Sequence, residues 1–193
     1  MGRWEPNTRE RLVRAAVELF AEQGYDMTTV NEIAERAGTT KTTFFRHFPD
    51  KREALFAGQD THSRLLADAV AAAPDTATPL DAVGVALDAL TAAFPPERRA
   101  FAARLRVVIA GNDELRERAA FKRAGLAVAL TDALQQRGVP DPTADLAAEL
   151  GVLAFYRAFD RWVDPADDPA TDQTFTDLAR QALRELRAAL PEL

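Results

Sequence analysis

Apolar residues recur every three to four positions along most of the chain, which is the spacing of one face of an α-helix. No stretch alternates apolar and polar residues as a half-buried strand does. An early example is the series Leu12, Ala15, Ala16, Leu19 and Phe20, which ends before Gly24. The chain is therefore predicted to be all-α with about nine helices, three small ones at the N-terminus and six in a larger body.

Residues 28–56 contain two short helical patterns separated by a glycine. In the first, Thr29 and Glu32 have the spacing of a capping box, which fixes a helix start. Gly38 follows, and glycine readily adopts the left-handed conformation that ends helices. Thr39 or Thr40 can then cap the second helix. This order predicts a helix-turn-helix.

The second short helix separates its apolar and polar residues. Phe44 and Phe48 are four apart and share one side, whereas Lys41, Thr42, Thr43 and His47 fall on the other. A small, polar and basic surface of this kind suits a recognition helix that enters the major groove of DNA.

The segment around this motif resembles the N-terminal domain of TetR/AcrR-type bacterial transcription regulators. The resemblance is carried by the first apolar series with Gly24 and Tyr25, and by the exit from the second short helix, Arg46 to Lys51. Two positions depart from the family pattern. Thr42 stands where a glycine is common, and Phe45 where a tyrosine usually bonds a DNA phosphate. The resemblance implies a DNA-binding domain over 1–50 and a ligand-binding and dimerisation domain over 51–193.

Ten residues are expected at the DNA. Lys41 and Thr43 are expected to read base edges, with Asn31 and Thr42 as weaker candidates, and Arg3 or Arg9 could follow a groove from the N-terminus. The others are expected mainly at the sugar-phosphate backbone. The full set is Thr28, Thr29, Asn31, Thr40, Lys41, Thr42, Thr43, Phe45, His47 and Lys51.

The formal net charge of −6 at first opposes nucleic-acid binding, but its distribution does not. Residues 1–56 are neutral overall, so the net negative charge comes entirely from residues 57–193. Residues 39–52 contain four basic residues and only one acidic residue, Asp50. Affinity for DNA depends on such a local patch and not on the total charge. A solvated helix face is the alternative interpretation of this cluster.

The body is divided by prolines and glycines into further helices. Asp50 is predicted to cap a helix that runs through Leu66 and Val70, and Pro79 to open the next. A helix containing Phe101 is expected to end near Gly111, and Asn112 to cap a long one. Asp141-Pro142 and Asp168-Pro169 predict helices over 142–163 and 169–190.

The predicted helix over 142–163 is apolar nearly all round, so it needs cover on every side. A second subunit could supply part of that cover, or the helix could be the core of a monomer. The resemblance favours a homodimer joined by a four-helix bundle of the last two helices. A twofold dimer would place two recognition helices about 34–36 Å apart.

Aromatic residues of the body fall on helices that surround an effector cavity in the resembling family. An apolar pocket with a few polar anchors is what a small-molecule site needs, although aromatic residues at helical spacing also fill ordinary cores. The candidate ligand residues are Phe101, Arg104, Phe121, Phe155, Tyr156 and Phe159. The expected function is a repressor that a small apolar effector releases from a palindromic operator. The alternatives are a ligand-independent or activating DNA binder, or an all-α interaction module with an inactive head.

Other chemistry has little support in the sequence. The chain has no cysteine, and its histidines, His47 and His62, lack metal-ligand spacing. Asp164, Asp167, Asp168 and Asp172 could suggest a cation site, but a solvated loop explains them better. We therefore expect no enzyme activity, no cofactor and no metal. No apolar run is long enough for a membrane span and no leader is visible, which favours a bacterial cytoplasmic protein that lies on the nucleoid when bound to DNA.

Overall fold

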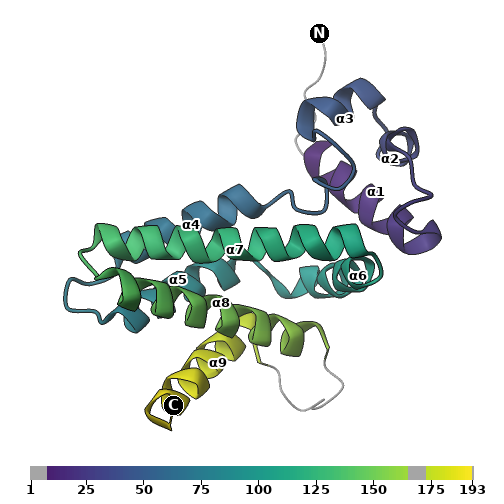
Figure 1. Ribbon diagram of the computed structural model, residues 1–193. Helices are drawn as coiled ribbons and strands as arrows, with labels where there is room; N and C mark the ends of the chain where they lie inside the picture. The colour runs from purple at the N-terminus through teal and green to yellow at the C-terminus, as the bar shows by residue number, and fades with distance from the viewer. Residues whose placement is uncertain (1–7, 165–172, 193) are drawn as a thin grey trace. The chain divides into compact units, whose positions relative to one another are not determined.

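The computed structural model describes residues 8–164 and 173–192 (Figure 1). Over these residues it contains nine α-helices and no strand, which confirms the predicted fold class. The helices are α1 Thr8–Gln23, α2 Val30–Arg36, α3 Lys41–His47, α4 Gln59–Ala72, α5 Pro79–Ala92, α6 Arg99–Ala110, α7 Asp113–Gln136, α8 Asp141–Val163 and α9 Phe175–Ala189, with short 3-10 turns at Pro96–Arg98 and Leu190–Glu192.

The chain forms two compact units. One comprises residues up to Ala57 together with Arg104–Ala119, and the other comprises Gly58–Ala103 with the chain from Ala120 onward. We call them the head unit and the body unit. The head unit thus reaches beyond residue 50 and includes the start of α7, a segment far away in the sequence. The assignment of DNA binding to 1–50 and ligand binding to 51–193 remains a prediction.

Two helix starts differ from those predicted. Residues 51–58 form successive turns, with Leu55 N–H bonded to Arg52 O at 3.0 Å, and α4 begins only at Gln59. Asp50 accepts the Glu53 N–H at 2.9 Å, so it caps this turn and not α4. The last helix begins at Phe175 after a Thr174–Asp177 capping box, whereas Asp168-Pro169 lies outside the described residues.

The body unit is built around α5, which packs against α4, α8 and α9. Val83, Leu87 and Leu90 of α5 are at most 2% exposed. Gly151 brings α8 close to α5, since a Cβ at this position would clash with Val83 Cγ1. Arg137, after the end of α7, donates to the carbonyls of Val70, Ala71, Ala73 and Pro74 at 2.7–3.3 Å and so caps the C-terminus of α4.

Candidate nucleic-acid interface

The start of α2 has the capping box that the sequence predicts. Thr29 lies in the extended region, its N–H and hydroxyl both donate to Glu32 Oε2 at 2.7 Å, and the Glu32 N–H returns a bond to the Thr29 hydroxyl at 3.3 Å. These bonds from Thr29 hold the pKa of Glu32 below its usual value. The start of α2 is therefore fixed by its N-cap, Thr29.

The turn between α2 and α3 also follows the prediction. Gly38 has φ +66°, and the Thr39 N–H reaches back to Ala34 O at 2.9 Å. Of the two candidate caps, Thr40 is the one used, because its hydroxyl accepts the Thr43 N–H at 3.2 Å. The glycine and this cap together place α3 against α2.

Helix α3 presents one apolar and one polar side. Phe44 and Phe48 are at most 2% exposed, with ring centroids 5.5 Å apart. Lys41 and Thr42 are exposed on the opposite side, Thr43 and His47 are half-buried, and Phe45 is 48% exposed. Asn31 on α2 is exposed as well. This arrangement leaves a short helix with a basic, hydroxyl-rich surface available to a partner.

Two residues expected at the DNA backbone have other partners in the structure. Thr28 is 1% exposed, and its hydroxyl donates to Gly24 O at 2.8 Å. The Lys51 ammonium donates to Tyr25 O at 2.6 Å and to Thr28 O at 2.9 Å. Both polar groups are therefore bonded inside the head unit, and their phosphate contacts remain a prediction. The residue spacing alone could not reveal these tertiary bonds.

The N-terminal arm is only partly described. Arg3 lies outside the described residues. Arg9 belongs to the first turn of α1 rather than to an extended arm, and its guanidinium lies 5.1 Å from the centre of the Phe48 ring. This contact connects α1 to the end of α3.

A charged cluster that the sequence did not suggest connects the first turns of α7 to the rest of the head unit. The Tyr25 hydroxyl and Arg52 donate to Glu114 at 3.2 and 3.0 Å, and Arg118 donates to Glu53 at 2.6 Å. Burial and the nearby Glu114 charge raise the pKa of Tyr25 to about 12. No motif marks these residues, since 89 positions separate Tyr25 from Glu114.

The candidate ligand residues of the body are dispersed. Phe155 and Phe159 belong to a cluster of rings with Phe94, Trp162 and Phe175, whose centroids lie 4.9–6.4 Å apart. Tyr156 lies beside this cluster, and the guanidinium carbon of Arg123 lies 4.7 Å from the centroid of the Tyr156 ring. Phe101 is half-buried, and Arg104 is exposed in the head unit. The Phe121 side chain is 66% exposed.

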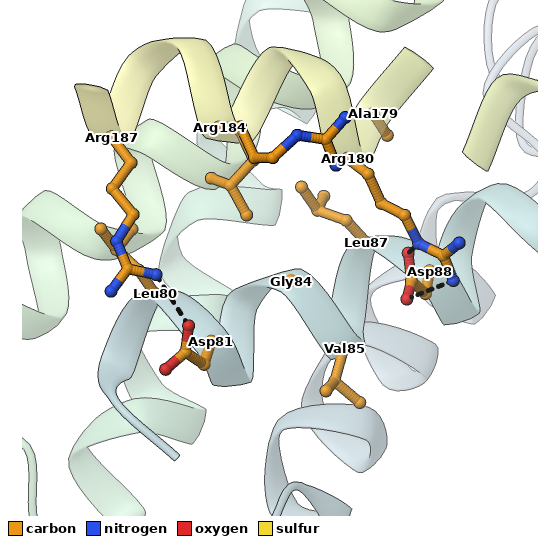
Figure 2. Close-up of a pocket in the computed structure, with 11 residues that line it drawn as sticks. Leu80, Asp81, Gly84, Val85, Leu87, Asp88, Ala179, Arg180, Arg184 and Arg187 are labelled. Carbon is orange, nitrogen blue, oxygen red and sulfur yellow. Dashed lines mark hydrogen bonds and ion pairs between the residues drawn. The ribbon is translucent and has the colours of Figure 1, made fainter. Parts of the chain in front are cut away.

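A groove of about 280 Å³ lies between α5 and α9 of the body unit (Figure 2). Two ion pairs cross it, Arg187 to Asp81 at 2.9 Å and Arg180 to Asp88 at 2.8 Å. Its walls come from residues 80–88 and 179–187, so the candidate ligand residues on α6, α7 and α8 lie elsewhere. The assignment of the ligand residues therefore remains a prediction.

Neither a membrane-spanning helix nor a metal-binding cluster is present among the described residues. In that part of the chain no helix is both long and apolar enough to cross a membrane. The same residues contain no group of three or more acidic, histidine or cysteine side chains placed to hold a metal ion. Of the acidic loop, Asp167, Asp168 and Asp172 lie outside the described residues.

Comparison with known proteins identifies the N-terminal part of the chain. Residues 12–57 match the family model of bacterial regulatory proteins, tetR family. The match covers the helix-turn-helix and the helix before it, and it supports a TetR/AcrR-type regulator. The TcmR regulator of Streptomyces glaucescens is 39% identical over 83 residues, which are 43% of this chain and 37% of that protein. The activator FasR of Mycolicibacterium smegmatis is 37% identical over 70 residues, or 36% of this chain and 32% of FasR. The chain thus spans about a third of these curated relatives.

Solved structures of transcriptional regulators resemble most of the chain in fold. FadR of Bacillus subtilis, in complex with stearoyl-CoA, has a TM-score of 0.62 and 19% identity over 92% of this chain and 96% of its own. FadR of Thermus thermophilus, in complex with lauroyl-CoA, has a TM-score of 0.51 and 26% identity over 93% of each chain. Together with the family model, these similarities support a TetR/AcrR-type protein.

Proposed function

We propose that this chain is a DNA-binding transcriptional regulator. The observation that carries the proposal is α3, a capped helix whose phenylalanines are buried and whose lysine and threonines face outward in a TetR-family domain. Such a helix can enter the major groove, where side chains reach base edges. The net negative charge does not oppose this, because the acidic excess belongs to residues 57–193.

We assign the contacts by exposure. Lys41, Thr42 and Thr43 on α3, with Asn31 on α2, are the residues for base edges. Thr29, Thr40, Phe45 and His47 lie at the helix starts or along α3 and are the residues for the sugar-phosphate backbone. Thr28 and Lys51 are removed from the contact set, because their polar groups are bonded within the head unit.

The regulator is proposed to act as a homodimer through α8 and α9. Leu146 of α8 is 55% exposed in the single chain, and Leu150 and Leu153 continue the same stripe at half-buried positions. An apolar stripe of this kind is expected where another helix packs. Leu146→Arg should weaken the dimer and spare the fold, whereas Ala158, which is fully buried in one chain, would disrupt the core if replaced.

The effector is proposed to be a largely apolar molecule that binds beside the ring cluster of α8. An acyl-CoA is the first class to test, because the T. thermophilus FadR structure, 26% identical to this chain, holds lauroyl-CoA. An effector that prefers the state unable to bind DNA weakens operator binding, and DNA weakens effector binding to the same extent. The free energy of this coupling is typically about 1–3 kcal/mol. If the effector releases the protein from its operator, the protein acts as a repressor. FasR, one of the relatives, is named an activator, so the opposite response is the second candidate.

A gel-shift titration with the DNA upstream of the protein's own gene tests the proposal. We expect binding at nanomolar to sub-micromolar concentration at low salt, abolished by an excess of the same fragment. Thr43→Ala should reduce the preference for this fragment over random DNA. Adding lauroyl-CoA should shift the titration, toward weaker binding for a repressor. A protein that retards no fragment at low salt would be an interaction module and not a regulator.

A further inference from the structure

One ammonium group contacts three carbonyls of the turn between α1 and α2, residues 24–29. The Lys51 ammonium donates to the carbonyls of Tyr25 at 2.6 Å, Thr28 at 2.9 Å and Asp26 at 3.5 Å. A lysine ammonium has three N–H donors and no acceptor. Because three carbonyls surround it, two of them within 2.9 Å, its donors are directed toward the turn.

The ammonium is enclosed from another side by an aromatic ring. Lys51 Nζ lies 4.2 Å from the centroid of Tyr25, within the range of a cation–π contact. Tyr25 is 8% exposed, and its ring packs edge-on against Phe20 of α1 at 5.1 Å. Lys51 is half-buried, and the carbonyls of the turn and the Tyr25 ring contact its ammonium from different sides.

The held turn leads directly into the helix-turn-helix. Thr28, whose carbonyl Lys51 binds, also fixes Gly24 through its hydroxyl, and the next residue, Thr29, caps α2. Lys51 lies three residues beyond Phe48, the C-cap of α3. One side chain therefore ties the exit of α3 to the entry of α2, and any shift of this tie changes the relation of the two helices.

We propose that Lys51 is a positioning residue for DNA binding, one that acts by fixing the turn before α2 and makes no phosphate contact. This inference rests on the proposed function of the head unit. Its consequence concerns charge. Loss of a phosphate contact lowers the slope of log K against log salt by about 0.9, whereas loss of a positioning residue leaves the slope unchanged.

The test uses the full chain and three variants, titrated against the same promoter fragment over a salt series. Lys51→Met removes the ammonium and keeps the length of the side chain. We expect weaker binding at every salt concentration, by about tenfold, with the wild-type slope. The control is Lys41→Met on the exposed side of α3, which removes an ammonium group that can neutralise DNA charge and should therefore flatten the slope. Lys51→Arg, which keeps donors for the carbonyls, should recover part of the lost affinity with the same slope.

A measurement on the wild-type chain covers the case in which Lys51→Met does not fold. The sequence has only three lysines, at 41, 51 and 122, so their ¹⁵Nζ signals can be assigned by substitution. We expect a hydrogen-bonded, slowly exchanging Lys51 ammonium in the free protein, and no change of its signal when DNA binds, whereas the Lys41 signal should move. The measurement on the free protein requires no DNA. It therefore tests the Lys51 contacts even if the proposed function is wrong.

Three results would overturn the inference. One is a fast-exchanging Lys51 ammonium in the free protein. Another is a Lys51 signal that moves with DNA in the manner of Lys41. The third is a Lys51→Met variant that flattens the salt slope as much as Lys41→Met, or that binds as tightly as the wild type. In the second case and in the flattened-slope case DNA binding itself would remain established.

Discussion

Gly151 is the point at which α8 comes closest to α5, and we predict that Gly151→Ala destabilises the protein. An added Cβ would clash with Val83 Cγ1 and would lie 3.5 Å from Leu130 Cδ1. Val83 is fully buried on a helix, where a β-branched side chain has one strongly preferred rotamer, so its methyl group cannot swing aside. The two helices must separate instead.

Two opposing terms give the magnitude. Forcing an extra methyl group into a packed core costs about 1–3 kcal/mol. Replacing a helical glycine by alanine stabilises the folded helix by about 1 kcal/mol. The free energy of unfolding should therefore fall by about 0–2 kcal/mol at Gly151. Gly125→Ala is the matched control, because nothing lies within 4 Å of a Cβ at Gly125 in the interior of α7, and only the favourable helix-propensity change remains.

Urea unfolding followed by circular dichroism, at equal protein concentrations, measures both variants. The predicted result is that Gly125→Ala is the more stable of the two by at least about 1 kcal/mol. Adding Val83→Ala should cost less in the Gly151→Ala background than in the wild type, because it removes the clashing methyl group. Equal stabilisation by the two glycine substitutions would refute the close α5–α8 contact.

Three further predictions concern other parts of the chain. Arg137→Met should lower the free energy of unfolding by about 1–3 kcal/mol, measured in urea, because it leaves the C-terminal carbonyls of α4 without their charged donor. The raised pKa of Tyr25 means that the folded state disfavours the phenolate. The contribution of Tyr25 to the free energy of unfolding is therefore intact below pH 10 and should be lost from there to about pH 12. Thermal melts should show a smaller loss for Tyr25→Phe in that window, and an equal loss would argue against the assignment. Phe45→Tyr should tighten operator binding severalfold in a gel-shift titration by adding a phosphate donor to a half-exposed ring.

Local signals predicted the elements that they specify. The Thr29–Glu32 capping box and the Gly38 turn were readable because a cap is set by residues within one helical turn of each other. The start of the last helix was not, since its signal, Thr174 with Asp177, competed with the stronger-looking Asp168-Pro169 pair. The stretch 51–58 was also misread as helix, because its apolar spacing is compatible with successive turns as well as with an α-helix.

The candidate sites depend more heavily on contacts between distant residues. The polar surface of α3 followed from helical periodicity, but the roles of Thr28 and Lys51 did not, because residue type indicates a charge and not the partner that satisfies it. The same holds for Glu114, which meets Tyr25 and Arg52 only after folding. In the body, periodicity grouped Phe155 with Phe159 correctly on α8, yet it could not show that Phe121 is largely exposed.

Hydroxyl-radical footprinting of the promoter fragment tests most directly whether this chain is a dimeric DNA-binding regulator. Two copies of α3 related by a twofold axis should protect two backbone segments about 10 base pairs apart, or a multiple of that spacing, on one face of the duplex. The account predicts these two protected segments, and predicts that Leu146→Arg weakens both together. A single protected segment would contradict the dimer, and uniform cleavage at saturating protein would contradict DNA binding.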